Sequence, residues 1–181
     1  MMRPARALLP LFLVPVLLTG CDADKNGGAT ADSADLDAAA RVWGVAPELV
    51  YVTQVSGYTV FKESAGEYED EFVTAYRSDE GTTKFGLFAG RGTMTARSCP
   101  ERPLGEVSDK RVTCEHDGDA WYRKAGASHE YAVPIDDVLV HLIADADKVD
   151  RAVLREAAEA VHRPTGTELA ALLPSTNSMG T

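Results

Sequence analysis

The stretch RVTCEHDGDAWYRKAGASHEYAVPIDDVLVHLIA, residues 111–144, decides the fold, because short strand-like segments follow one another in it with turn residues between them. We expect strands at 111–116, 120–124, 130–133 and 138–144. Asp117-Gly118-Asp119 joins the first two, since glycine supplies the positive φ that a tight hairpin turn needs. Pro134 and the aspartates after it are expected to end the third strand. Strands joined by such short turns predict an antiparallel sheet.

The sequence upstream of this stretch extends the same pattern. Residues 72–77 alternate Phe, Thr and Tyr with Val, Ala and Arg, which is typical of a strand with one apolar face. Further strands are expected at 49–55, 58–61, 83–88 and 93–97. Gly90 and Gly92 are expected to separate the last two. A short amphipathic helix is expected at 36–43, where Gly44 closes it.

Two helices are expected after the last strand. Asp150 is the predicted N-cap of the first, which carries an apolar stripe and ends before Pro164. The second begins with the capping box Thr165-x-x-Glu168 and ends at Pro174. Strands followed by helices predict an α+β domain: an antiparallel sheet of roughly five to seven strands with C-terminal helices packed on one face.

The charge balance of the chain limits its partners. Its 181 residues include 28 Asp and Glu against 18 Lys and Arg, a formal net charge of −10. This balance argues against nucleic acid as a partner, because binding to phosphates requires a basic patch. Electrostatic attraction to an anionic membrane is disfavoured for the same reason. The hydrophobic content of 45% is that of a globular domain.

The first twenty residues are typical of a signal peptide. Arg3 and Arg6 precede an apolar run, residues 7–18, which as a helix would cover only about 18 Å of a hydrocarbon core of about 30 Å. The run ends in Leu18-Thr19-Gly20-Cys21, which resembles the lipobox of bacterial lipoproteins. That resemblance implies that the Cys21 thiol receives a diacylglyceryl group and that cleavage leaves Cys21 first in the mature chain. The alternative is an ordinary secreted protein with a chance cysteine at this place.

The resulting organisation has four parts. We expect a lipoprotein-type signal peptide at 1–20, the lipidated cysteine with an acidic flexible tether at 21–40, a single domain at 41–174 and a disordered tail at 175–181. Two acyl chains make a durable anchor. The membrane is therefore an expected partner through the lipid, on the extracytoplasmic face of the cell membrane.

The two remaining cysteines are expected to form a disulfide. With Cys21 lipidated, Cys99 and Cys114 are left as an even pair in an oxidising compartment. Two free buried thiols are the alternative. A catalytic thiol is disfavoured, because no basic neighbour is poised to lower its pKa.

No catalytic constellation emerges from the sequence. A Gly-x-Ser-x-Gly elbow and a phosphate-binding loop are both absent from it. The carboxylates at 67–71 are expected to be solvated rather than a glycosidase pair. Residue types that bind zinc gather near one hairpin: His116, Asp117, Asp119, His129 and Glu130. Their spacing is that of polar surface, so we expect no metal and no cofactor.

The aromatic residues offer a binding interpretation. They are spread through the expected strands: Tyr58, Phe61, Tyr68, Phe72, Tyr76, Phe85, Phe88, Trp121, Tyr122 and Tyr131. About half should point into the core. Any that share the opposite face could line a ligand surface, since aromatic side chains give contact area at low entropic cost.

Residues 114–174 resemble a group of uncharacterised lipoproteins from actinobacteria, and the likeness extends more loosely to Ser98-Cys99-Pro100. It rests on Cys114-Glu115, Trp121-Tyr122-Arg123, His129-Glu130-Tyr131, Val149-Asp150-Arg151 with Leu154-Arg155, and Glu168-Leu169…Leu172-Leu173-Pro174. The resemblance implies location and architecture, and it carries no catalytic residues.

Together these observations favour a non-catalytic, membrane-anchored module that binds a ligand or a surface protein. The alternative is an extracytoplasmic carrier of lipid or another apolar ligand, with the sheet curved around a cavity. A hydrolase or metal enzyme ranks third. A filled core with a flat aromatic patch would favour the module, and a deep apolar cavity would favour the carrier.

Overall fold

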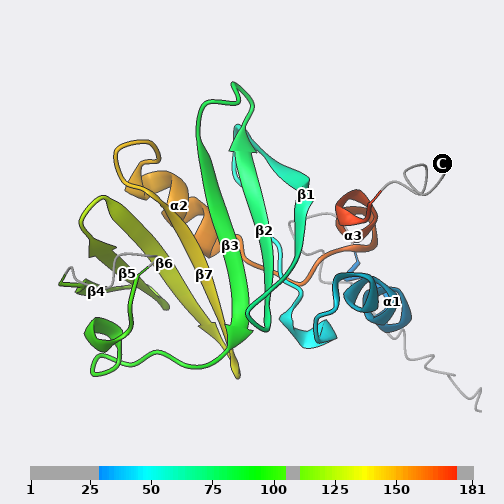
Figure 1. Cartoon of the computed structure of the whole chain (residues 1–181), viewed down its shortest axis with the longest axis horizontal. Helices are drawn as coiled ribbons and strands as arrows, with labels where there is room; N and C mark the ends of the chain where they lie inside the picture. Colours follow the sequence, from blue (N-terminus) through cyan, green and yellow to red (C-terminus); the bar gives the residue numbers. More distant parts are fainter. Residues whose placement is uncertain (1–28, 105–110, 175–181) are drawn as a thin grey trace, which may run out of the picture.

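The structure is a computed structural model that describes residues 29–104 and 111–174. Within these residues, seven strands form one antiparallel sheet in the order β1-β2-β3-β7-β6-β5-β4 (Figure 1). The strands are β1 (Tyr58–Tyr68), β2 (Glu71–Ser78), β3 (Lys84–Arg91), β4 (Thr113–Asp117), β5 (Ala120–Ala125), β6 (Ser128–Ile135) and β7 (Val138–Asp145). The helices are α1 (Ser33–Trp43), α2 (Arg151–Glu159) and α3 (Gly166–Leu172), with short 3₁₀ helices η1 (Pro47–Leu49) and η2 (Cys99–Glu101). The predicted α+β class is confirmed.

The sheet consists of two meanders that meet in its middle. Strands β1, β2 and β3 follow one another as hairpins, and so do β4, β5, β6 and β7. The second meander returns to place β7 beside β3. The predicted hairpin turn after Cys114 is confirmed, with Asp117 paired to Ala120 and Gly118 at a φ of 63°. The connection from β3 to β4 must therefore cross the sheet.

Pro134 does not end the third strand of the decisive stretch, contrary to expectation. It lies inside β6 and pairs with Leu139 of β7. The β5–β6 pairing stops at Ala132, so the end of β6 has a strand neighbour on one side only. A proline has no N–H to donate and is tolerated where that side of the strand has no ladder partner.

Residues 49–55 are not a strand, contrary to expectation, because other groups bind their backbone. The Arg163 guanidinium donates hydrogen bonds to the carbonyl oxygens of Pro47, Glu48 and Val50, at 2.7, 2.8 and 2.9 Å. Val52 forms only an isolated bridge with His162. The apolar side chains of this segment are still buried in the core.

Residues 93–97 are also not a strand. The Thr95 and Ser98 side chains bond each other's backbone N–H groups, Ser98 Oγ at 3.0 Å and Thr95 Oγ1 at 3.2 Å. Such local side-chain bonds compete with a strand ladder and favour turns. The segment instead enters η2.

All three helices pack on one face of the sheet around a single filled core. That core includes Val140 and Leu142 of β7, Leu154 of α2 and Leu172 of α3, each at most 1% exposed. The predicted alternation of residues 72–77 is confirmed, since Phe72, Thr74 and Tyr76 are buried whereas Val73 and Ala75 are only partly buried. No helix in the described part of the chain is long and apolar enough to span a bilayer.

The folded part begins earlier than the predicted boundary at residue 41. Helix α1 starts at Ser33, behind the N-cap Asp32, and buries Leu36 and Ala40 against the core. The second part of the predicted tether is therefore helix. The signal peptide, Cys21 and the tail at 175–181 lie outside the described residues.

The predicted helix ends are mostly confirmed. Gly44 closes α1 in the left-handed region, at a φ of 78°. Thr165 and Glu168 form the predicted capping box at the start of α3. Asp150 is the N-cap residue of α2, but its side chain makes no capping hydrogen bond.

Candidate functional site

The face of the sheet opposite the helices is covered on one half only. The described part of the β3–β4 connection, residues 92–104 with η2, packs against the half made by β4 to β7 (Figure 1). Met94 and Cys99 of this connection pack against Ala132 and Leu139 of the sheet. No described helix or loop covers the other half, which is made by β1, β2, β3 and the adjoining side of β7.

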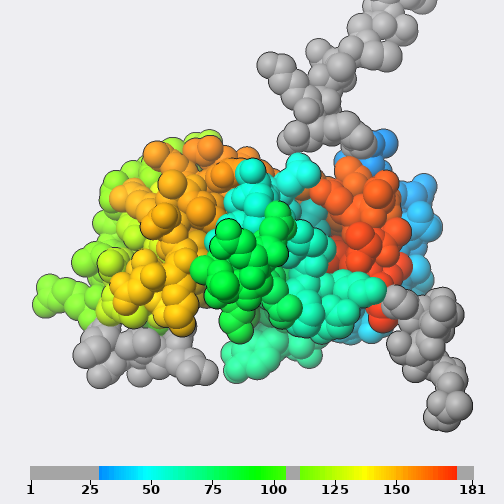
Figure 2. Space-filling view, turned by 90° about the horizontal axis from the view of Figure 1, so that it is seen from above, coloured from blue at the N-terminus to red at the C-terminus, as the bar shows by residue number. Residues whose placement is uncertain are grey.

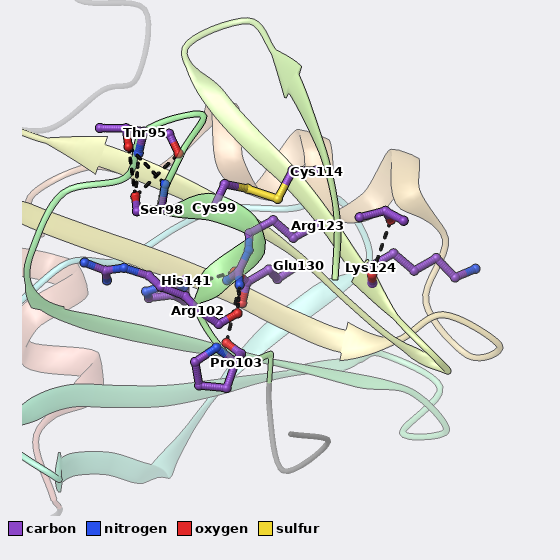
Figure 3. Close-up of a disulfide and its surroundings, with 11 residues drawn as sticks. Thr95, Ser98, Cys99, Arg102, Pro103, Cys114, Arg123, Lys124, Glu130 and His141 are labelled. Atoms are coloured by element: carbon purple, nitrogen blue, oxygen red, sulfur yellow. Dashed lines mark hydrogen bonds and ion pairs between the residues drawn. A yellow bond between two sulfur atoms is a disulfide. The ribbon is translucent and has the colours of Figure 1, made fainter. Parts of the chain in front are cut away.

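The covering connection is fixed at two points (Figure 3). A disulfide joins Cys99 to Cys114 of β4, with a Cα–Cα distance of 6.3 Å, as the sequence predicts. Arg123 of β5 then donates hydrogen bonds from Nη2 to the carbonyl oxygens of Arg102 and Pro103. One covalent and one polar contact therefore hold the connection against the sheet.

Arg123 belongs to a buried charged row that the sequence alone did not reveal. Its Nη1 pairs with Oε1 of Glu130 on β6, and both side chains are 2% exposed or less. The same oxygen lies 3.3 Å from Nδ1 of His141 on β7. Arg123 Nε has no hydrogen-bond partner in the described part of the chain. A buried charge is costly unless it is paired, so this row depends on keeping all its members.

The uncovered half carries five partly exposed apolar side chains, which we call the open face: Phe61, Val73, Ala75, Phe88 and Ile143. None of them packs against the buried core clusters. The Phe88 ring lies close to Gly86, since a Cβ there would come within 2.7 Å of Cε2 of the ring. Glycine at this position therefore leaves room for the Phe88 ring on the open face.

Two cations border the open face at one end. Arg77 of β2 and Lys84 of β3 are directly opposite each other in the ladder. The Arg77 guanidinium lies over the Phe61 ring, 4.4 Å from its centroid. Neither cation forms an ion pair with a described carboxylate. Like charges opposite each other destabilise a sheet, so the pair is an unusual arrangement in an acidic chain.

Glu71 lies at the other end of β2 and is not the solvated carboxylate that the sequence predicts. It is half-buried and lies across Gly90, where a Cβ would come within 2.5 Å of Oε1. Gly90 is therefore inside β3 rather than between two strands. Burial raises the pKa of Glu71, while the charge of His141 opposes that effect.

We expect Glu71→Gln to stabilise the protein at neutral pH. Because the folded-state pKa is raised, the folded chain holds its proton at a pH where the unfolded chain has lost it. Wild-type stability therefore falls as pH rises from the ordinary value of 4.5 through the raised folded value. The variant lacks this loss, so its melting temperature at pH 7 should exceed that of wild type by at most a few degrees.

Thermal melts between pH 4 and pH 8 check this prediction. The gain should disappear towards pH 4, where the wild-type carboxyl is also neutral in both states. Glu69→Gln, in the same turn but exposed, is the matched control and should change little. A gain of the same size at every pH would contradict the explanation.

The zinc-binding residue types near the β4–β5 hairpin are already engaged with other groups. Glu115 and Asp117 bind Arg151 of α2, at 2.9 and 2.8 Å, and Arg151 lies over the Tyr122 ring, 4.0 Å from its centroid. Hydrogen bonds from Tyr131 and Arg151 lower the pKa of Asp117. These contacts fasten the start of α2 to β4, β5 and β6.

The histidines of that hairpin lie apart. His129 hydrogen-bonds with the Tyr122 hydroxyl at 3.2 Å, whereas His116 packs edge-on against Trp121. Glu130 points to the opposite face, towards Arg123. No group of three His, Cys, Asp or Glu side chains within residues 29–104 and 111–174 is arranged to hold a metal ion.

A pocket of about 360 Å³ opens where the acidic turn between β1 and β2 faces the α1–η1 connection. Its lining includes Glu67, Glu69, Asp70 and Glu71 on one side and Leu49 on the other. Arg91 also lines this pocket, and its described lining contains no histidine, serine, threonine or cysteine.

The aromatic residues divide between core and surface as the sequence suggests. Phe72, Tyr76 and Phe85 are at most 4% exposed, and Tyr76 stacks on Phe85 with ring centroids 4.9 Å apart. Phe61 and Phe88 lie on the open face. The alternation of residues 72–77 could have located this face, but not the absence of a described element over it.

Comparison of the chain with protein-family models, curated proteins and solved structures gave no match. The resemblance to actinobacterial lipoproteins stays a prediction.

Proposed function

We propose that this chain is a non-catalytic lipoprotein, anchored through Cys21 on the extracytoplasmic face of the membrane, whose domain binds a partner protein through the open face. The observation that carries the binding role is the open face itself: a partly exposed apolar surface bordered by two cations that form no ion pair with a described carboxylate. Exposed patches of this kind commonly mark interaction sites on otherwise polar proteins. Arg77 and Lys84 suit a partner that brings a carboxylate or another anionic group.

The filled core supports a binding module over a carrier of lipid or another apolar ligand. The space between sheet and helices is occupied by side chains that are almost completely buried, among them Leu87, Leu142 and Leu154. Two pockets of the described chain, of about 360 and 240 Å³, both open to solvent. A carrier requires an enclosed apolar cavity for most of its ligand.

The anchor is tested by Cys21→Ala. We expect the variant to lack the diacylglyceryl mass and to keep its signal peptide, because only the thiol accepts the lipid and cleavage follows lipidation. Asp24→Ala, three residues further along, is the matched control and should behave as wild type. An unchanged mature mass in Cys21→Ala would contradict the lipoprotein assignment.

The open face is tested by site-specific photo-crosslinking in cells. A photoreactive residue at Val73 should give an adduct of defined mass with a partner protein, because Val73 is central in the open face. The same residue at the exposed Thr82, in the β2–β3 turn, is the control and should give none. The adduct should weaken several-fold in Arg77→Glu/Lys84→Glu. Equal adducts at both positions, or none at either, would refute this binding surface.

A further inference from the structure

A second apolar surface lies at the other side of the molecule, between α1 and α3. It is a groove of about 240 Å³ whose lining includes Ala38, Val42, Leu169, Ala170 and Leu173. Val42 is 61% exposed, which makes it one of two large hydrophobic side chains in the described chain that are so open to solvent. The other, Tyr68, lies elsewhere, at the end of β1.

We propose that the groove between α1 and α3 contacts the outer leaflet of the membrane to which the protein is anchored. The inference rests on the proposed lipid attachment at Cys21. The occupant is a lipid surface, and the argument for it comes from the length of chain between the anchor and the fold.

Residues 30 and 31 are bonded to the rest of the folded domain. Thr30 forms a bridge with Thr165, and the N–H of Ala31 bonds the carbonyl oxygen of Pro164 at 2.9 Å. Nine peptide units separate Cys21 from Thr30, and they span at most about 30 Å however they are arranged. The start of α1 and the start of α3 are therefore held within that distance of the lipid.

The groove extends only a short distance from residues 30 and 31. Helix α1 has 11 residues, so it is about 16 Å long, and Val42 lies near its far end. Figures 1 and 2 place α1 and α3 together at one end of the long axis, with β4 and β5 at the opposite end. Of these elements, α1 and α3 are therefore the ones that the anchor keeps nearest to the leaflet.

A weak contact is enough under these conditions. A short tether gives the groove an effective concentration near the surface in the millimolar range, so a contact of millimolar strength is substantially occupied. The exposed charges of α1 set the lipid preference. Asp35 lines the groove, and Asp37 and Arg41 are exposed nearby, so anionic headgroups should weaken the contact at low salt.

The test uses the full mature chain, residues 21–181, made without lipid. Since Cys99 and Cys114 are bonded to each other, Cys21 is its single free thiol and couples to a maleimide-headgroup phospholipid in phosphatidylcholine vesicles. A photoreactive residue at Ala170 reports contact with lipid by mass spectrometry. The same residue at Asp119, in the β4–β5 turn, is the control.

We expect lipid adducts at position 170 to exceed those at position 119 several-fold. Val42→Asp should remove the excess, whereas Thr82→Asp, far from the groove, should leave it. Phosphatidylglycerol should lower the yield at low salt, and added salt should restore it. Equal yields at 170 and 119 would overturn the proposal, as would adducts at 170 that join two protein chains. The maleimide lipid supplies the anchor, so a natural chain without lipid at Cys21 would refute the proposed function but leave this result standing.

Discussion

Replacing Arg123 by methionine will destabilise the folded protein by about 3–5 kcal/mol, the usual cost of leaving a buried charge without its partner. Methionine fills similar space but pairs with nothing, so the Glu130 carboxylate keeps only His141, at 3.3 Å. The carbonyl oxygens of Arg102 and Pro103 lose their donor in the same step. Urea unfolding at pH 7 measures the loss.

A second substitution separates the charge effect from the loss of packing. In Arg123→Met/Glu130→Met the unpaired charge is gone, so most of the lost stability should return, because a buried ion pair is often replaceable by apolar side chains at little cost. Arg155→Met, which removes an arginine at the exposed surface, is the matched control and should cost less than about 1 kcal/mol. If the double variant is as unstable as the single one, packing rather than charge explains the effect.

The sequence predicted the strand faces well where alternation is strict. Phe72, Thr74 and Tyr76 share the buried face of β2 as expected, because a strand of regular pleat has only two sides. Alternation cannot show whether an element covers the other side. That depends on the β3–β4 connection, which a disulfide fixes over one half of the sheet and not over the other.

The sequence could have predicted the buried ion pair between Arg123 and Glu130, but only with the register of the β5–β6 hairpin known. Arg123 stands two residues before Ala125, and Glu130 stands two residues after Ser128, on either side of a two-residue turn. Pairing of Ala125 with Ser128 therefore places opposite charges side by side. Their burial follows from tertiary contacts, and a charged residue in an alternating strand is otherwise expected to face solvent.

The two segments wrongly predicted as strands fail for different reasons: local side-chain bonds act at 93–97, and a long-range contact acts at 49–55. Residues 49–55 have strand-like composition, but Arg163, more than a hundred residues away, binds the carbonyl groups around Glu48 and Val50. The local sequence of residues 49–55 cannot indicate a hydrogen-bond donor that lies so far along the chain. Helix α1 was predicted at 36–43, and only its first turn, from Ser33, lies in a stretch whose acidic sequence predicted a tether alone.

Removal of the disulfide by Cys99→Ser/Cys114→Ser should cost about 3 kcal/mol, the loop-closure entropy of a chain segment of about 15 residues. Reduction of wild type should give a similar loss, and the double serine variant should not respond to reductant. Non-reducing mass mapping of the wild type should find Cys99 joined to Cys114. Unchanged stability on reduction would contradict the structural role of this bond.

The disulfide and Arg123 hold the same connection, so their effects should be coupled. Without the disulfide, residues 102 and 103 can move away from Arg123, and their carbonyl oxygens then accept its hydrogen bonds less often. The buried pair of Arg123 and Glu130 also becomes more exposed to water. The combined variant should therefore lose less stability than the sum of the separate losses, since the second change removes contacts that the first has already weakened. Strict additivity would show instead that the connection is fixed independently at its two points.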